Sequence, residues 1–399
     1  MCVLSTAAVF LVTMLDTDEI GRLVPAITQA SLETLLTIIS ASMLVIATFA
    51  VASMVAAYAS ASNTATPRAF SLVISDDVSQ NSLSTFIGAF IFSVVALIAL
   101  ENGYYGKAGR FWLFVLTLMM LAMIIVTFVS WVDRIARLGR LKGTINKVEA
   151  ATAAAFQRRR RAPTLHGAPG GRRANGDLVI YGGSIGYVQR VDVSALQACA
   201  KKSRLRITLA ALPGTFSAPG RALAYVTADS GDLSGIDASR IAKAFLIGDD
   251  RQFEEDPRFG LVVLSEIASR ALSSAVNDPG TAIYIIGVFV RLFALWSEPV
   301  EEGDTQTGEC DRVEVPEISL LDMFDDAFTA IARDGAGAIE VAGRLQKALE
   351  SLASIGDVAM RDAAIHHSRM ALARAENAME LPADLQVVRK SANFANCIT

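Results

Sequence analysis

The stretch Ser40–Ser62 reads SASMLVIATFAVASMVAAYASAS, and it lies inside a run of 34 residues, 34–67, that carries no charged side chain. Two more uncharged runs follow, of 23 residues at 78–100 and of 22 residues at 111–132. A helix needs about 20 mostly apolar residues to cross a bilayer, and charged side chains are costly inside it. The three runs therefore predict three membrane-spanning helices.

Residues 1–15 are also uncharged and predict a further, shortened span. Of all 399 residues, 52% are hydrophobic and only 19% are charged, whereas a soluble domain carries about 25% charged residues. This composition excludes a disordered chain and argues against a purely soluble one. We expect an α-helical membrane half within residues 1–135, with about four spans. They are predicted at about 1–15, 33–59, 83–101 and 111–132.

Basic residues after the last span predict the orientation of the chain. Nine Lys and Arg residues lie between Arg134 and Arg161, against one acid, Glu149. Because such residues are retained on the cytoplasmic side, we expect a multi-pass protein of the bacterial inner membrane with a cytoplasmic C-terminal half. Arg158–Arg161 are either part of a solvated linker or a contact with anionic lipids.

The second span is rich in Ala and Ser, which allow helices to approach closely in lipid. Tight packing is one explanation, and a pore wall formed by Ser40, Thr48 and Ser53 is the other. No ionisable residue lies in the middle of a predicted span. Because ion-coupled transporters usually need one, this argues against coupled transport and leaves a passive channel open.

The C-terminal half is predicted to be α+β. A basic helix and a Pro/Gly/Arg linker occupy 136–176, a small β-rich unit follows at 177–230, and a helical domain fills 235–399. Alternating apolar residues and two Pro-Gly turns make the β-rich unit resemble a barrel-sandwich hybrid, so we expect a barrel-like packing unit. The acidic and polar segment 297–316 predicts an exposed loop.

The densest cluster of polar residues lies between Asp249 and Thr281. Asp256-Pro257 and Asp278-Pro279 each predict a helix start, because Asp accepts from free amides and Pro suits the first helical position. Crowded charges beside apolar helices can shift pKa values for acid–base chemistry, or they can form structural ion pairs. The candidate functional residues are Asp250, Arg251, Glu255, Asp256, Arg258, Asn277, Asp278 and Thr281.

Several classes of site are not indicated by the sequence. The four cysteines are far apart, the three histidines form no metal-binding spacing, and no phosphate-binding or hydrolase motif occurs. We therefore expect no metal and no cofactor, and no catalytic residues are assigned. The net charge of −4 argues against nucleic acid as a partner. The expected partners are the lipid bilayer and further copies of the chain.

The order of these segments resembles a bacterial family of predicted integral membrane proteins, the domain of unknown function 2254 family. The resemblance covers nearly the whole chain, and its most specific part is Asp256 to Thr281, within EDPRFGL…IASRALSSAVNDPGTA. The family typically has a Pro-Gly-Ile-like stretch where this chain has Ser274-Ala275-Val276. Because the family has no established activity, the resemblance implies architecture and not chemistry.

Three functions are compatible with the sequence. The first is a channel-like or permeation-modulating oligomer, based on the Ser/Thr-bearing second span. The alternative is a membrane-anchored sensor or scaffold, based on the apolar helix predicted at 281–296 beside the charged segment 249–258. The third is an enzyme with an acidic site around 249–258.

Overall fold

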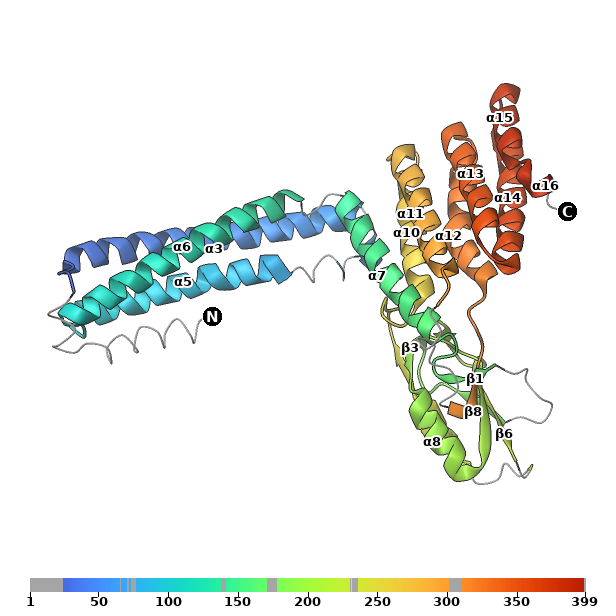
Figure 1. The fold of residues 1–399 in the computed structure, drawn as a ribbon, viewed down its shortest axis with the longest axis horizontal. Helices are drawn as coiled ribbons and strands as arrows, with labels where there is room; N and C mark the ends of the chain where they lie inside the picture. The colour runs from blue at the N-terminus through green and yellow to red at the C-terminus, as the bar shows by residue number, and fades with distance from the viewer. Residues whose placement is uncertain are drawn as a thin grey trace. The chain divides into compact units, whose positions relative to one another are not determined.

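The computed structural model describes residues 24–64, 66–69, 72, 77–137, 141–170, 178–229, 231, 236–300 and 310–397. The chain forms two compact units, Met1–Thr144 and Ile145–Thr399, which are taken separately below (Figure 1).

In its described part, the N-terminal unit has three long helices: α3 (Gln29–Thr64), α5 (Asp77–Glu101) and α6 (Lys107–Arg137). They pack against one another, and each contains a stretch long and apolar enough to cross a membrane. The predicted spans 33–59, 83–101 and 111–132 lie within them, and the predicted first span, 1–15, lies outside the described residues. A short 3-10 turn, η1 (Pro67–Ala69), follows α3.

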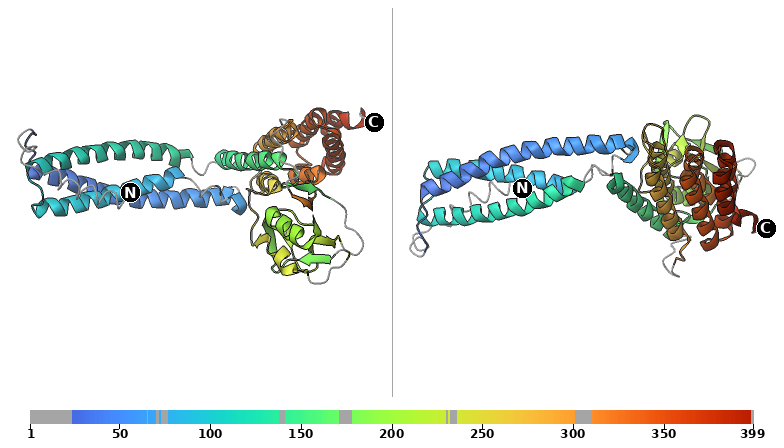
Figure 2. Two further views of the ribbon diagram at one scale, coloured as in Figure 1. Left: turned by 60° about the horizontal axis from the view of Figure 1, so that its bottom comes forward. Right: turned by 90° about the horizontal axis from the view of Figure 1, so that it is seen from above.

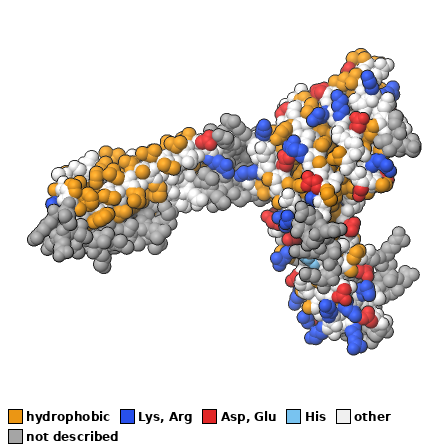
Figure 3. Space-filling model, viewed as in Figure 1, with side chains coloured by type: hydrophobic (Ala, Val, Ile, Leu, Met, Phe, Trp, Pro, Cys, Tyr) orange, Lys and Arg blue, Asp and Glu red, His pale blue; other side chains and the backbone are white. Residues whose placement is uncertain are grey.

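An inward-facing stripe holds this bundle together. On α3 the buried residues recur every three or four positions, as expected for one helix face; they are Leu32, Leu36, Ile39, Met43, Ala47 and Ala50. Trp131 of α6 is only 2% exposed, and its ring lies edge-on to Phe86 of α5 at 6.2 Å. Large apolar side chains also cover the outside of the bundle (Figure 3), including Val45 and Val126, each 67% exposed. Such a surface suits lipid rather than water.

The C-terminal unit contains two open sheets in its described part. The first has the order β1-β8-β4-β6-β2 and the second β5-β3-β7. The strands are β1 (Gly167–Pro169), β2 (Leu178–Tyr181), β3 (Gly186–Val191), β4 (Leu205–Leu209), β5 (Phe216–Ser217), β6 (Ala222–Ala228), β7 (Phe245–Gly248) and β8 (Cys310–Val315); α8 (Val193–Ser203) and α9 (Ala238–Ala242) connect them. A closed barrel is not shown.

Two strands lie where other structure was predicted. β1 falls inside the predicted linker, and β8 falls inside the predicted loop 297–316. β8 pairs in parallel with both β1 and β4, and its Val313 and Val315 are fully buried. The apolar side chains at these alternate positions enter the core of the larger sheet, which explains why the segment is extended and inside the unit.

The other regular elements in the described part of the C-terminal unit are helices. The helices are α7 (Leu141–Arg161), α10 (Pro257–Ala271), α11 (Pro279–Ser297), α12 (Leu320–Asp334), α13 (Ile339–Ile355), α14 (Val358–Ala378), α15 (Pro382–Ala392) and α16 (Phe394–Cys397). Helix α12 contacts both α10 and α14, and helix α13 contacts both α11 and α15. They therefore form two rows (Figure 2).

The apolar helix α11 begins one of these rows, beside α10 and α13. By length and composition it too could cross a membrane. Its Phe289 and Phe293 are fully buried, and they contact the ring of Phe328 on α12 at 5.3 and 5.7 Å. Helix α7 adds Phe156, whose ring lies 5.0 Å from that of Trp296. These contacts place α11 in the core of the C-terminal unit.

Candidate functional site

Asp256 is the centre of the predicted charged cluster. Its side chain caps α10 by accepting hydrogen bonds from the backbone amides of Arg258 and Phe259, at 3.1 and 3.2 Å. Its other carboxylate oxygen accepts a hydrogen bond from Nε of Arg251 at 2.7 Å. Asp256 is 3% exposed, so this is a buried, paired carboxylate. The helix starts predicted at Asp256-Pro257 and Asp278-Pro279 are confirmed.

Arg258 joins the same end of α10 to α12. Its Nε donates to Asp326 at 2.6 Å, and its Nη1 donates to Asp322 at 2.8 Å. Burial alone would lower the pKa of Arg258. The bond to Asp326 and the charges of the three nearby aspartates together outweigh this effect, so the pKa is raised. Burial raises the pKa of Asp326 despite the opposing effect of Arg258. The two short bonds of Arg258, rather than the pKa of Asp326, indicate a closely held ion pair.

Arg159 of α7 is the residue that the sequence interpretation missed at this site. It is 4% exposed, and its Nη2 lies 3.4 Å from the backbone oxygen of Glu255. Burial lowers its pKa to about 10, while the carboxylates of Glu255 and Asp256 oppose that shift. Its position in a run of four arginines resembles a solvated linker in sequence, so no local signal distinguishes it.

The neighbouring arginines also bind within the C-terminal unit. Nε of Arg158 donates to the backbone oxygen of Glu254 at 3.0 Å, and Arg160 donates to the backbone oxygen of Glu298. These residues form the last turn of α7 rather than a linker. The structure thus gives Arg158 and Arg160 protein partners, and it does not test a contact of this run with lipid.

Gly214 brings the β-rich region to the cluster. A Cβ at this position would overlap the carboxylate of Asp256, and the backbone has a φ of +94°. Nearby, the side chain of Gln189 on β3 donates to the backbone oxygen of Asp250 at 2.8 Å. The side chain of Asp250 is exposed and that of Glu255 is half-buried. The cluster is therefore a junction between α7, the 249–256 segment, α10, α12 and the strands.

The second group of predicted residues lies elsewhere. Asp278 caps α11 by accepting from the backbone amide of Thr281 at 3.1 Å and from its hydroxyl at 2.6 Å. Asn277 has a φ of +50°, which Asn tolerates better than most residues, and it is exposed. Because α10 has 15 residues, about 22 Å of helix separates this turn from Asp256. The eight candidate residues therefore form two sites, not one.

The candidate pore residues are distributed around α3. Ser40 and Ser53 are half-buried and Thr48 is exposed. At about 100° per residue, these positions do not share one helix face. The hydroxyls of Ser40 and Thr48 donate to the backbone oxygens of Thr37 and Val45, at 2.9 and 2.8 Å, as is usual for such residues inside helices.

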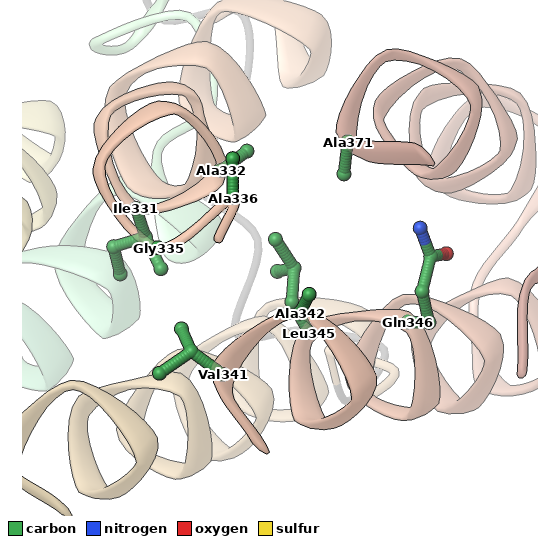
Figure 4. A pocket seen from close by; sticks show the side chains of 9 residues that line it. All are labelled: Ile331, Ala332, Gly335, Ala336, Val341, Ala342, Leu345, Gln346 and Ala371. Carbon is green, nitrogen blue, oxygen red and sulfur yellow. The ribbon is translucent and has the colours of Figure 1, made fainter. Parts of the chain in front are cut away.

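A small cavity lies between α12, α13 and α14 (Figure 4). Ala332, Val341, Leu345 and Ala371 are among the residues that line it, with the amide of Gln346 at its edge. That amide is already paired, because it donates to the backbone oxygen of Ser368 at 3.0 Å and accepts from the Ser368 hydroxyl at 2.6 Å. The cavity is an apolar packing gap rather than a site with a free polar group.

Metal ligands are not assembled in the described part of the chain, where no group of three or more His, Cys, Asp or Glu side chains is placed to hold an ion. His367 is instead buried beside the ring of Phe324 at 5.8 Å. Its Nε2 lies 3.3 Å from Asp325.

These observations define a class of protein: a membrane protein with a bundle of apolar helices, followed by a unit of mixed sheets and paired helical rows. A family model described as "Predicted membrane protein (DUF2254)" matches residues 1–351, and the chain belongs to this family. The resemblance to this family, stated for nearly the whole chain, is thereby confirmed.

Two relatives are similar to part of the chain. They are the uncharacterized proteins Mb1321c of Mycobacterium bovis and Rv1290c of Mycobacterium tuberculosis, each 36% identical over 105 residues. The matched segment is 25% of this chain and 20% of each relative, so the match spans about a fifth of their length. No solved structure matches the chain.

Proposed function

We propose that the chain is a membrane-anchored scaffold whose C-terminal unit binds a partner through its two rows of helices. The observation that carries the proposal is that the charged side chains of the cluster bind to the unit itself. Asp256, Arg258 and Arg159 are engaged with other parts of the same unit. The cluster therefore supports a rigid junction better than a catalytic site, and the enzyme hypothesis loses its main support.

Helix α7 supports the anchoring part of the proposal. Only three residues, 138–140, separate it from α6 in the sequence. Within the C-terminal unit it is fixed by Glu149, which accepts from Nε of Arg291 at 2.7 Å, and by Asn146, which accepts from the Tyr284 hydroxyl at 2.9 Å. A packed helix, rather than a free linker, thus receives the chain after the last described span.

The helical rows support the binding part. Stacked helices expose extended surfaces that repeat proteins use for partners. Exposed apolar side chains on the last helices include Met370, which is 42% exposed, and Val387, which is 52% exposed, and Leu381, directly before α15, is 57% exposed. The basic residues after the last span support a cytoplasmic position of this unit in the bacterial inner membrane.

The test is photo-crosslinking in cells, with a photoreactive amino acid in place of Val387 in the full-length chain. We expect an adduct with a second protein that is absent when the probe replaces Met119, which is 64% exposed on α6. Ion flux through vesicles holding the purified protein should equal that of empty vesicles. Ion flux above the level of empty vesicles, together with no adduct from the Val387 probe, would overturn the scaffold proposal and favour a channel.

The channel remains the second candidate on one observation. Thr48 is exposed on α3, so an assembly of several copies can direct it toward a shared axis. A Thr48→Val variant would then alter flux without altering the melting temperature. Equal flux in both proteins would count against this candidate.

A further inference from the structure

The outward face of the three-stranded sheet is the strongest unassigned surface. In β3 and β7, Val188 and Phe245 point into the core and are at most 5% exposed, so their neighbours point outward. The strand register aligns Tyr187 with Phe216 on one side and with Gly248 on the other. It also pairs Arg190 with Leu246.

The centre of this face is apolar. Phe216 is 39% exposed, Leu246 53% and Ile185, in the turn before β3, 63%. The rings of Tyr187 and Phe216 are in contact, with centroids 5.1 Å apart. These four residues are called the sheet patch. Apolar side chains that gather on one exposed surface indicate a contact with another molecule.

Opposite charges flank the sheet patch along the strands. Exposed Arg190 lies beside Leu246 at one end. At the other end, β7 leads past Gly248 into Asp249 and Asp250, which are both exposed. The bond from Gln189 to the backbone oxygen of Asp250 fixes this acidic end relative to β3. The surface therefore runs from basic through apolar to acidic.

We propose that the sheet patch is an isologous contact between two copies of this chain. A two-fold axis through such a surface brings the same patch of each copy together. It would align Arg190 of one copy with Asp249 and Asp250 of the other and would cover the four apolar side chains on both. This self-complementary order of charges is what favours a second copy over an unrelated protein. Anchoring of both copies in one membrane raises their effective concentration.

The experiment measures the monomer–dimer equilibrium of the full-length protein in detergent by sedimentation. Arg190→Glu creates like charges across the contact, and Leu246→Asp buries a charge in it, so each should raise the dimer Kd by about tenfold or more. The decisive variant combines Arg190→Glu with Asp249→Lys and Asp250→Lys. This exchange restores opposite charges and should return the Kd to near that of the wild type.

The matched control is Val276→Asp, at an apolar position in the turn before α11 that is 53% exposed, as Leu246 is. It should leave the Kd unchanged. At concentrations well below the dimer Kd, all variants should keep the wild-type melting temperature, because the substituted side chains are exposed in the monomer. A monomeric wild-type protein, a dimer that Arg190→Glu and Leu246→Asp do not weaken, or a charge exchange that fails to restore it would each overturn the proposal.

Discussion

Asp256 shows how one carboxylate can serve a helix, an ion pair and a packing contact together. Asp256→Ala removes the cap of α10 and leaves Arg251 without its partner, so we expect a loss of about 3 kcal/mol in the free energy of unfolding. Asp256→Asn keeps a capping side chain and should cost less. Thermal unfolding of the full-length protein measures both. Asp249→Ala, an exposed change in the same segment, is the control, and an equal loss there would contradict this role.

His367 gives the C-terminal unit a dependence on acid. Burial lowers the pKa of His367 to about 4; Asp325 opposes this shift, and the positive charges of His366 and Arg374 add to it. In the unfolded chain a histidine binds its proton near pH 6.5. The unfolded state therefore gains the proton first, and stability is lost as the pH falls from about 6.5 toward 4, by at most about 1.4 kcal/mol per pH unit.

Unfolding measured at several pH values checks this prediction. His367→Gln should remove most of the slope between pH 6.5 and 4. His366→Gln, a change at the exposed neighbouring histidine, should keep it. If the slope in the His367→Gln protein matched that of the wild type, another group would be responsible.

Sequence alone predicts the local part of the charged cluster and not its partners. The two Asp-Pro helix starts are recognisable because capping depends on adjacent residues. The partners of Arg258 are 64 and 68 residues further along the chain, and Arg159 comes from a helix 96 residues before the segment it contacts. Such distant pairings depend on how helices pack, which a local pattern does not specify.

At the scale of elements, α7 and α10 approach closely where Gly260 faces Thr152. A Cβ at Gly260 would overlap the Thr152 side chain. Gly260→Ala should therefore destabilise the protein by about 1–3 kcal/mol, as overpacked cores do, although Ala favours a helix. At Gly287 of α11 the nearest neighbour that a Cβ would meet is Nη1 of Arg291, at 3.9 Å. Gly287→Ala should stabilise by about 1 kcal/mol from helix propensity.

The opposite signs of these two glycine changes are the measurable result, in thermal unfolding of the full-length protein. Stabilisation by both would show that α7 and α10 can separate without cost. A double variant, Gly260→Ala with Thr152→Ala, removes the Thr152 hydroxyl that would lie nearest to the added Cβ and should recover part of the loss.

The elements also show where sequence interpretation succeeds and fails. Long uncharged runs predict α3, α5 and α6 because the bilayer imposes a simple rule on length and charge. β8 was predicted as a loop, since acids and Gly dominate the segment before it. The alternation of Val313 and Val315 was the available signal for a strand. The parallel pairing of β8 with β1 and β4 has no such local signal, because it joins segments more than 100 residues apart.

For the whole molecule, exposed apolar side chains have two different meanings. In the N-terminal unit they cover long apolar helices (Figure 3), and they are explained by lipid. In the C-terminal unit they lie among charged residues, and they are explained by protein partners or by ordinary surface. The distinction depends on the surrounding helix and not on the exposed fraction of any one side chain.

An arginine scan tests this distinction directly. Met119 on α6 is 64% exposed and Val387 on α15 is 52% exposed. Met119→Arg places a charge near the middle of a predicted span and should cost about 2.5–3.5 kcal/mol of insertion free energy, lowering the amount of membrane-integrated protein. Val387→Arg faces water and should leave that amount unchanged. Equal recovery of the two variants from membranes would mean that α6 does not face lipid at Met119, and the assignment of the N-terminal unit as a lipid-exposed bundle would have to be revised.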